Sequence, residues 1–81
     1  MQVQNNRRKN LIDVLNQLEQ EGLATREAQA VYLGGAVSAS RLQLMVNGAH
    51  ISVFFALSAE HALFKPRGWL SKAHSVETGS A

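Results

Sequence analysis

The residue types best suited to recognition chemistry lie together in VSASRLQLMVNG, residues 37–48. Ser40, Arg41 and Gln43 carry hydrogen-bonding side chains and alternate with apolar residues such as Leu42. Hydroxyl, guanidinium and carboxamide groups can bond to the edges of nucleic-acid bases, and the arginine fork matches guanine. These residues therefore predict a recognition surface that works by equilibrium hydrogen bonding, with no covalent step.

Catalytic and metal-binding constellations do not stand out in the sequence. There is no cysteine, which excludes disulfides and thiolate metal clusters. The histidines at 50, 61 and 74 are too far apart to form a helical metal pair, and no Ser/His/Asp set, phosphate loop or carboxylate pair is specific enough to argue for catalysis. We expect a protein that is not an enzyme, has no cofactor or metal, and acts on no small-molecule substrate.

The charge of the chain is mildly basic and unevenly distributed. Its 81 residues carry a formal net charge of +2, and the sequence pI is about 9.5. Basic residues cluster at 7–9 and again between 65 and 72. This balance permits a polyanionic partner without requiring one, since most such clusters are solvated surface.

The sequence contains no expected membrane segment. No stretch approaches the roughly 20 apolar residues needed to cross a bilayer. The N-terminal MQVQNNRRKN is polar and then basic, and no long apolar run follows it, so it does not resemble a signal peptide. We expect a cytoplasmic protein that does not contact membranes.

The first expected helix covers residues 6–21, with Asn5 or Asn6 as its cap and Gly22 as its stop. Its apolar residues follow the spacing i, i+3, i+4, i+7 of one helix face. They are Leu11, Val14, Leu15 and Leu18.

Three shorter helices are expected at 26–33, 38–47 and 53–64. Each begins at or directly after a residue that favours the N-cap position. These caps are Thr25, Ser38 and Ser52. Pro66 ends the last helix and is expected to open one final turn, while the alternative of a strand at 49–55 is disfavoured by the helical sequence after it. The prediction is an all-α, compact bundle of four to five short helices, with one domain at 1–74 and a flexible tail at 75–81.

Two short helices joined by the glycine-containing turn GGAV have the outline of a helix-turn-helix. In such a unit the first residues of the second helix meet base edges in the major groove. The expected base contacts are therefore Ser38, Ala39, Ser40, Arg41 and Gln43. The basic front end and the start of the preceding helix supply expected phosphate contacts. These are Arg7, Arg8, Lys9, Thr25 and Arg26.

The same stretch, TREAQAVYLGGAVSASRLQLMVNG followed by a helix and KPRGWL, resembles the lambda-repressor-like Cro and repressor DNA-binding domains of temperate phages. The resemblance covers roughly residues 9–71. Ala30 matches the small residue at the helix crossing, and Leu33 and Val37 match the core positions around the turn. Asn47-Gly48 matches the NG that commonly follows the recognition helix, and PRGWL resembles a closing Pro-x-x-Trp-Leu.

This resemblance implies a regulator of phage or prophage type, in particular a repressor, that binds specific double-stranded DNA as a homodimer. Three departures bear on that expectation, two of them near the turn and the third in the expected helix at 53–64. The turn carries about two extra residues around Gly34-Gly35, which puts the angle of the recognition helix in question. Gln29 stands where a leucine usually packs.

The expected helix at 53–64 is more apolar than this resemblance predicts, because it presents a surplus of large apolar residues. An exposed apolar patch commonly marks a partner surface. The expected homodimer contacts are Val53, Phe54, Leu57, Trp69 and Leu70. The alternative is a small helical adaptor or inhibitor that binds another protein through this face. Taken individually, Arg41 and Gln43 are most simply interpreted as ordinary surface residues.

Overall fold

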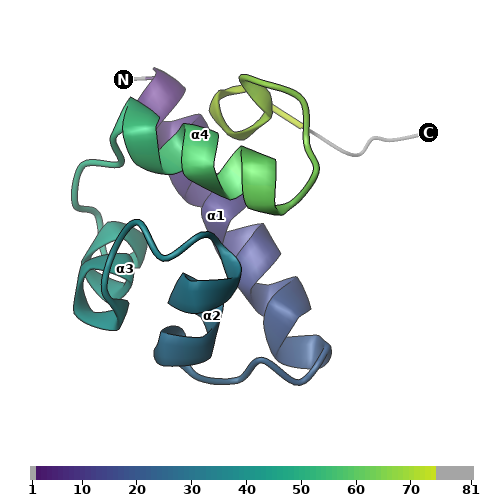
Figure 1. Cartoon of the computed structure of the whole chain (residues 1–81). Helices are drawn as coiled ribbons and strands as arrows, with labels where there is room; N and C mark the ends of the chain where they lie inside the picture. The colour runs from purple at the N-terminus through teal and green to yellow at the C-terminus, as the bar shows by residue number, and fades with distance from the viewer. Residues whose placement is uncertain (1, 75–81) are drawn as a thin grey trace.

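The computed structural model describes residues 2–74, and every regular element within that range is helical (Figure 1). The elements are α1 (Gln2–Gln20), α2 (Arg26–Tyr32), α3 (Ala39–Val46), α4 (Val53–Ala62) and the short 3-10 turn η1 (Trp69–Ser71). Figure 1 shows α2 and α3 beside one half of α1 and α4 across the other half. The expected all-α class is confirmed, whereas the expected tail at 75–81 lies outside the described residues.

Helix α1 has the predicted apolar stripe, and all four of its members are buried in the core. The helix begins at Gln2 and not at residue 6, so the expectation that Asn5 or Asn6 caps it was wrong. The N-terminal turns are polar, but several of their side chains are bonded to distant loops and are thereby ordered. Gly22, with φ of +104°, lies in the turn that follows the helix, as expected.

The three predicted N-caps are confirmed. Each cap side chain accepts a hydrogen bond from the backbone N–H three residues further on, and all three bonds are 3.1 Å long. The capped helices are α2, α3 and α4, and the caps are Thr25, Ser38 and Ser52. Because each bond satisfies a backbone donor that the helix leaves free, the starts of these helices follow from local sequence alone.

The core is formed by one side of every helix. Helix α3 contributes Leu42 and Met45, and α4 contributes Phe55, Ala56 and Ala59. Ile51, in the connection between these two helices, is also fully buried. The residues 49–52 that precede α4 form no strand, in agreement with the helical interpretation of this stretch.

Two buried polar side chains hold the segment after α4 in place. The Asn10 amide nitrogen donates to the carbonyls of Leu70 and Lys72, at 2.8 and 2.7 Å. The buried Glu60 carboxylate accepts the backbone N–H groups of Gly68 and Leu70, at 2.9 and 2.8 Å. Leu70 is thereby fixed from both sides.

The segment after α4 contains the turn that was expected at Pro66 and then continues into η1. A hydrogen-bonded turn opens at Pro66, whose carbonyl accepts the backbone N–H of Trp69 at 3.0 Å, and η1 follows from Trp69. Gly68 immediately precedes η1 with φ of +89°, a value that favours glycine. The direction of the chain therefore changes at Gly68.

Candidate nucleic-acid interface

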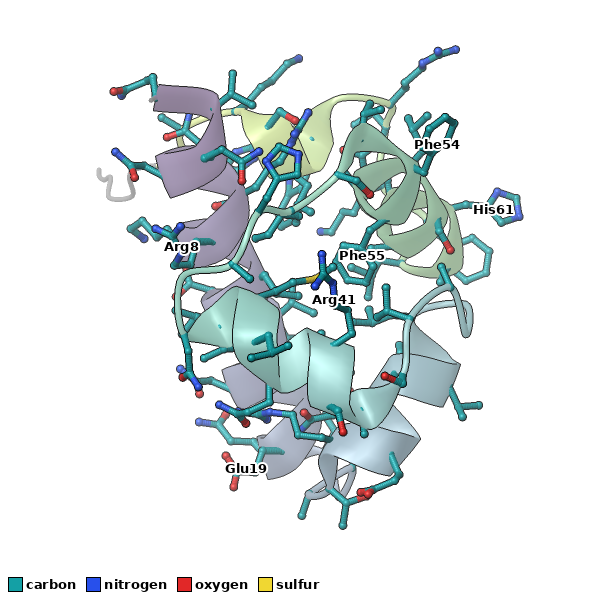
Figure 2. All side chains as sticks on the ribbon, turned by 90° about the vertical axis from the view of Figure 1, so that its left-hand side faces the viewer. Arg8, Glu19, Arg41, Phe54, Phe55 and His61 are labelled. Carbon is teal, nitrogen blue, oxygen red and sulfur yellow. The ribbon has the colours of Figure 1, made fainter. Side chains whose placement is uncertain are left out.

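The N-terminal end of α3 presents polar side chains to solvent. Ser38, Ser40 and Arg41 are exposed, while Ala39 and Gln43 are half-buried. Within the described part of the chain, the Arg41 guanidinium group makes no hydrogen bond or ion pair, and Figure 2 shows Arg41 on this helix. Ser38 is engaged as the N-cap, so the groups most available to a partner are those of Ser40 and Arg41.

The turn between α2 and α3 is built on two glycines with positive φ, +107° at Gly34 and +70° at Gly35. A Cβ atom on Gly34 would collide with Ser58 Oγ of α4. That hydroxyl group also donates a hydrogen bond of 3.3 Å to the carbonyl of Leu33. The turn that leads into α3 is thus held directly against α4.

Arg7 is engaged in hydrogen bonds within the protein. Its Nε donates to Ser71 Oγ and its Nη1 to the Ile51 carbonyl, each at 2.9 Å. Both bonds tie α1 to loops far away in the sequence. Arg7 therefore helps to hold these loops against α1, a role that the sequence did not predict.

The two other basic residues of the N-terminal cluster have separate surroundings. Arg8 Nη2 donates to the Gly48 carbonyl at 3.3 Å, which places this guanidinium group beside the end of α3 (Figure 2). Lys9 pairs with Asp13 at 3.2 Å on an exposed part of α1. An exposed pair of this kind contributes little to stability, but it neutralises part of the charge of Lys9. Of residues 7–9, Arg8 is the one that the structure brings to α3.

Arg26 is linked to α3 by a contact that the sequence did not reveal. Its Nε donates to Gln43 Oε1 at 2.8 Å, and its Nη1 donates to Gln29 Oε1 at 2.6 Å. Thr25, the other expected phosphate contact here, is exposed and uses its hydroxyl oxygen as the α2 cap. The α2–α3 pair is therefore bridged by polar side chains as well as by apolar contacts.

The outer side of α4 forms a second exposed surface, which we call the α4 face. Phe54 and His61 point away from the body of the molecule, whereas Phe55 points into it (Figure 2). Phe54 is 80% exposed and Phe64, just beyond the helix, is 95% exposed. The α4 face consists of Val53, Phe54, Leu57, His61 and Phe64.

Two of the expected dimer contacts do not belong to the α4 face. Leu70 is only 1% exposed, so it has no surface to offer a second chain. Trp69 is half-buried, packs against the core and stacks on His74 with ring centroids 4.5 Å apart. Phe64, which the sequence did not single out, is a further exposed apolar residue just beyond α4.

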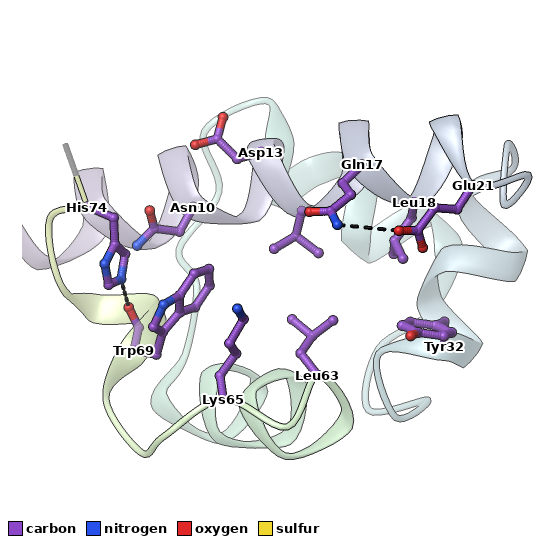
Figure 3. A pocket seen from close by; sticks show the side chains of 11 residues that line it. Asn10, Asp13, Gln17, Leu18, Glu21, Tyr32, Leu63, Lys65, Trp69 and His74 are labelled. Atoms are coloured by element: carbon purple, nitrogen blue, oxygen red, sulfur yellow. Dashed lines mark hydrogen bonds between the residues drawn. The ribbon is translucent and has the colours of Figure 1, made fainter. Parts of the chain in front are cut away.

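A groove of about 340 Å³ lies between α1 and residues 63–74 (Figure 3). The Lys65 ammonium group extends into it, 4.8 Å from the centre of the Trp69 ring, and His74 Nε2 lies 2.6 Å from the Trp69 carbonyl. Asp13 and Glu21 line the opposite wall. Among residues 2–74, no group of three or more histidine or acidic side chains is placed to hold a metal ion.

No protein-family model matches the chain, and searches of curated proteins and of solved structures find no match either. The case for a function consequently depends on the residues of this chain. None of the helices within residues 2–74 is both long enough and apolar enough to span a membrane.

Proposed function

We propose that this chain is a transcriptional regulator of phage or prophage type, acting as a repressor in the cytoplasm. It binds specific double-stranded DNA by placing α3 in the major groove, and it does so as a homodimer. The observation that carries this proposal is the exposed N-terminal end of α3, where Ser40 and Arg41 are accessible and the Arg41 guanidinium group has no bond within the described residues. A buried Arg41 would have argued against any such contact.

The proposed mechanism is equilibrium binding. Arg41 donates two hydrogen bonds to a guanine, Ser40 bonds to a neighbouring base, and Gln43 addresses an adenine. Arg8, beside the end of α3, contacts a phosphate and contributes an affinity that is independent of sequence and sensitive to salt. Occupation of a promoter by the bound protein then excludes the transcription machinery.

Selection of bound sequences from random duplex DNA tests this proposal. We expect a palindromic consensus, and we expect Arg41→Ala to weaken binding to it by ~1–3 kcal/mol with relaxed preference at one position. Arg8→Ala serves as the control, because loss of a phosphate contact lowers affinity almost equally for all sequences. An Arg41→Ala protein that discriminates between sequences as well as the wild type would refute the groove assignment.

We propose that the two chains of the homodimer contact each other through the α4 face. Four of its five residues are apolar and none is an aspartate, glutamate, lysine or arginine, so two copies can approach each other with little charge repulsion. Burial of Phe54 and Phe64 against a second copy would remove large apolar surfaces from water. Binding to a palindromic site requires a two-fold dimer to hold its two α3 helices about 34 Å apart, one turn of DNA.

The chain offers a matched pair of variants for the dimer. Val53 is 48% exposed in the first turn of α4 and Val3 is 44% exposed in the first turn of α1. An aspartate is favourable in the first turn of either helix, so neither substitution should damage the helix. We expect sedimentation equilibrium to show that Val53→Asp dissociates the dimer and that Val3→Asp does not. If both variants associated equally, the proposal that the α4 face forms the dimer contact would be refuted.

The second candidate function is a protein–protein adaptor or inhibitor that binds another protein through the α4 face. The exposure of Phe54 and Phe64 favours it. Salt distinguishes the two candidates, since DNA affinity falls steeply between low and physiological salt while an apolar interface scarcely responds.

A further inference from the structure

Gln29 is a polar residue in a position that excludes water. It is 0% exposed, and both ends of its amide are bonded: Nε2 donates to the Leu23 carbonyl at 2.8 Å, and Oε1 accepts Arg26 Nη1 at 2.6 Å. A buried amide that satisfies both of its groups is held in one orientation, because rotation would leave a donor facing a donor. The core of the protein thus fixes the atom to which Arg26 is bound.

Arg26 transmits this fixed position to α3. Its Nε donates to Gln43 Oε1 at 2.8 Å while Nη1 remains bonded to Gln29. The guanidinium group is planar, so two bonds from it determine both its location and its plane. Hydrogen bonds from a charged donor are also stronger than those between neutral groups. Arg26 therefore acts as a rigid bridge between the buried amide and Gln43.

Gln43 is restrained at both ends of its own amide. Its Oε1 accepts the bond from Arg26, and its Nε2 donates to Asn47 Oδ1 at 3.2 Å on the next turn of α3. One acceptor site on Oε1 and one hydrogen on Nε2 remain for another partner. An adenine requires one acceptor and one donor at the same amide, at fixed relative positions. The remaining groups of Gln43 match this requirement in number and kind.

We propose that Gln29 and Arg26 are positioning residues that orient the Gln43 amide before DNA arrives and so determine the base preference at the position that Gln43 reads. This inference rests on the proposed function. It also changes the expected role of Arg26, which acts chiefly through Gln43 and not as a simple phosphate contact. Pre-orientation has a physical advantage, since a free glutamine side chain loses rotamer freedom when it binds.

Substitution of Gln29 by leucine separates positioning from folding. Leucine is apolar, of similar size and suited to a buried site on a helix, so Gln29→Leu is expected to fold, while Arg26 loses the bond that fixes it. Arg26→Lys is a second route to the same result, because a single ammonium group retains the charge without the planar fork. Glu27→Gln, an exposed change on the same helix, is the control.

The readout is sequence selection from random duplex DNA with each purified variant. We expect Gln29→Leu and Arg26→Lys each to lower the preference at one base position by about fivefold, the effect of losing roughly one hydrogen bond, and to leave the other positions unchanged. Gln43→Ala should abolish the same preference, and Gln29→Leu should then have no further effect in the double variant. A purely structural role for Gln29 would instead weaken binding to all sequences together.

The possible failures are distinguishable. A wild-type protein that selects no sequence would overturn the proposed function and this inference with it. A wild-type protein whose consensus is unaltered by Gln29→Leu and by Arg26→Lys would overturn the inference alone. Equal losses at every base position would do the same.

In the free protein, we also expect the Arg26 Nε–H signal in NMR spectra to exchange more rapidly in Gln29→Leu than in the wild type.

Discussion

Helices α3 and α4 resemble each other on their inner sides and differ on their outer sides. They comprise 8 and 10 residues, each begins after a serine N-cap, and each buries an apolar side in the common core. Their outer sides are unlike, since α3 exposes Ser40 and Arg41 while α4 exposes Phe54. Folding requires the inner sides and does not require these outer residues. The outer sides are therefore where the two proposed contacts, with DNA and with a second copy of the chain, can be tested separately.

The largest expected effect is on stability, and it tests whether the inner side of α4 serves to hold the fold together. Glu60→Gln replaces one of two carboxylate oxygens by an NH₂ group that faces a backbone N–H of Gly68 or Leu70. We expect a loss of about 2–3 kcal/mol in the free energy of unfolding, measured by urea denaturation. Glu19→Gln is the control, because Glu19 is exposed on α1 (Figure 2). Similar stabilities for the two variants would contradict the buried role of Glu60.

The next effect tests the contact between α4 and the turn that leads into α3. Gly34→Ala places a side chain at φ of +107° and against Ser58 Oγ, so we expect a loss of about 2 kcal/mol in unfolding free energy. Gly35→Ala meets no atom within 4 Å at φ of +70° and should cost about 1 kcal/mol. Adding Ser58→Ala to Gly34→Ala should recover part of the loss. Equal costs for the two glycines would show that the contact with α4 is unimportant.

The smallest effect concerns Phe64, just beyond α4. It separates the stability of the monomer from the association of two chains. Phe64 has φ of +58°, an unfavourable conformation for a bulky residue, and its side chain is almost wholly exposed. We expect Phe64→Gly to raise the unfolding free energy of the monomer by about 0.5–1 kcal/mol, since glycine removes the strain but also frees the unfolded chain. The same variant should associate more weakly in sedimentation equilibrium. A loss of stability with unchanged association would contradict both expectations.

The parts of the fold that the sequence predicted are those with local causes. The three N-caps and the apolar stripe of α1 depend on residues a few positions apart, and both are present. The start of α1 was missed because Gln4 and Arg7 are ordered by bonds to Ile51, far along the chain. The burial of Glu60 was missed for a similar reason, since glutamate is rarely buried unless distant partners satisfy it.

In the candidate site, too, the features with local causes were predicted and the long-range contacts were missed. The capping pattern of α3 was sufficient to predict an exposed N-terminal end that includes Ser40 and Arg41. The bond between Arg26 and Gln43 joins residues 17 positions apart across an unusual turn, and no periodicity reports such a contact. Whether these residues read DNA remains the proposal to be tested by sequence selection.

The polar side chains of α1 have a consequence for how the chain folds. Gln4, Asn6 and Asn10 bond to backbone groups 47 to 65 positions away. Closing so long a loop costs entropy before any contact offsets it. The first helix of a growing chain therefore cannot complete its bonds until residue 72 has been synthesised. We expect this small helical protein to acquire its native state late and in one cooperative step.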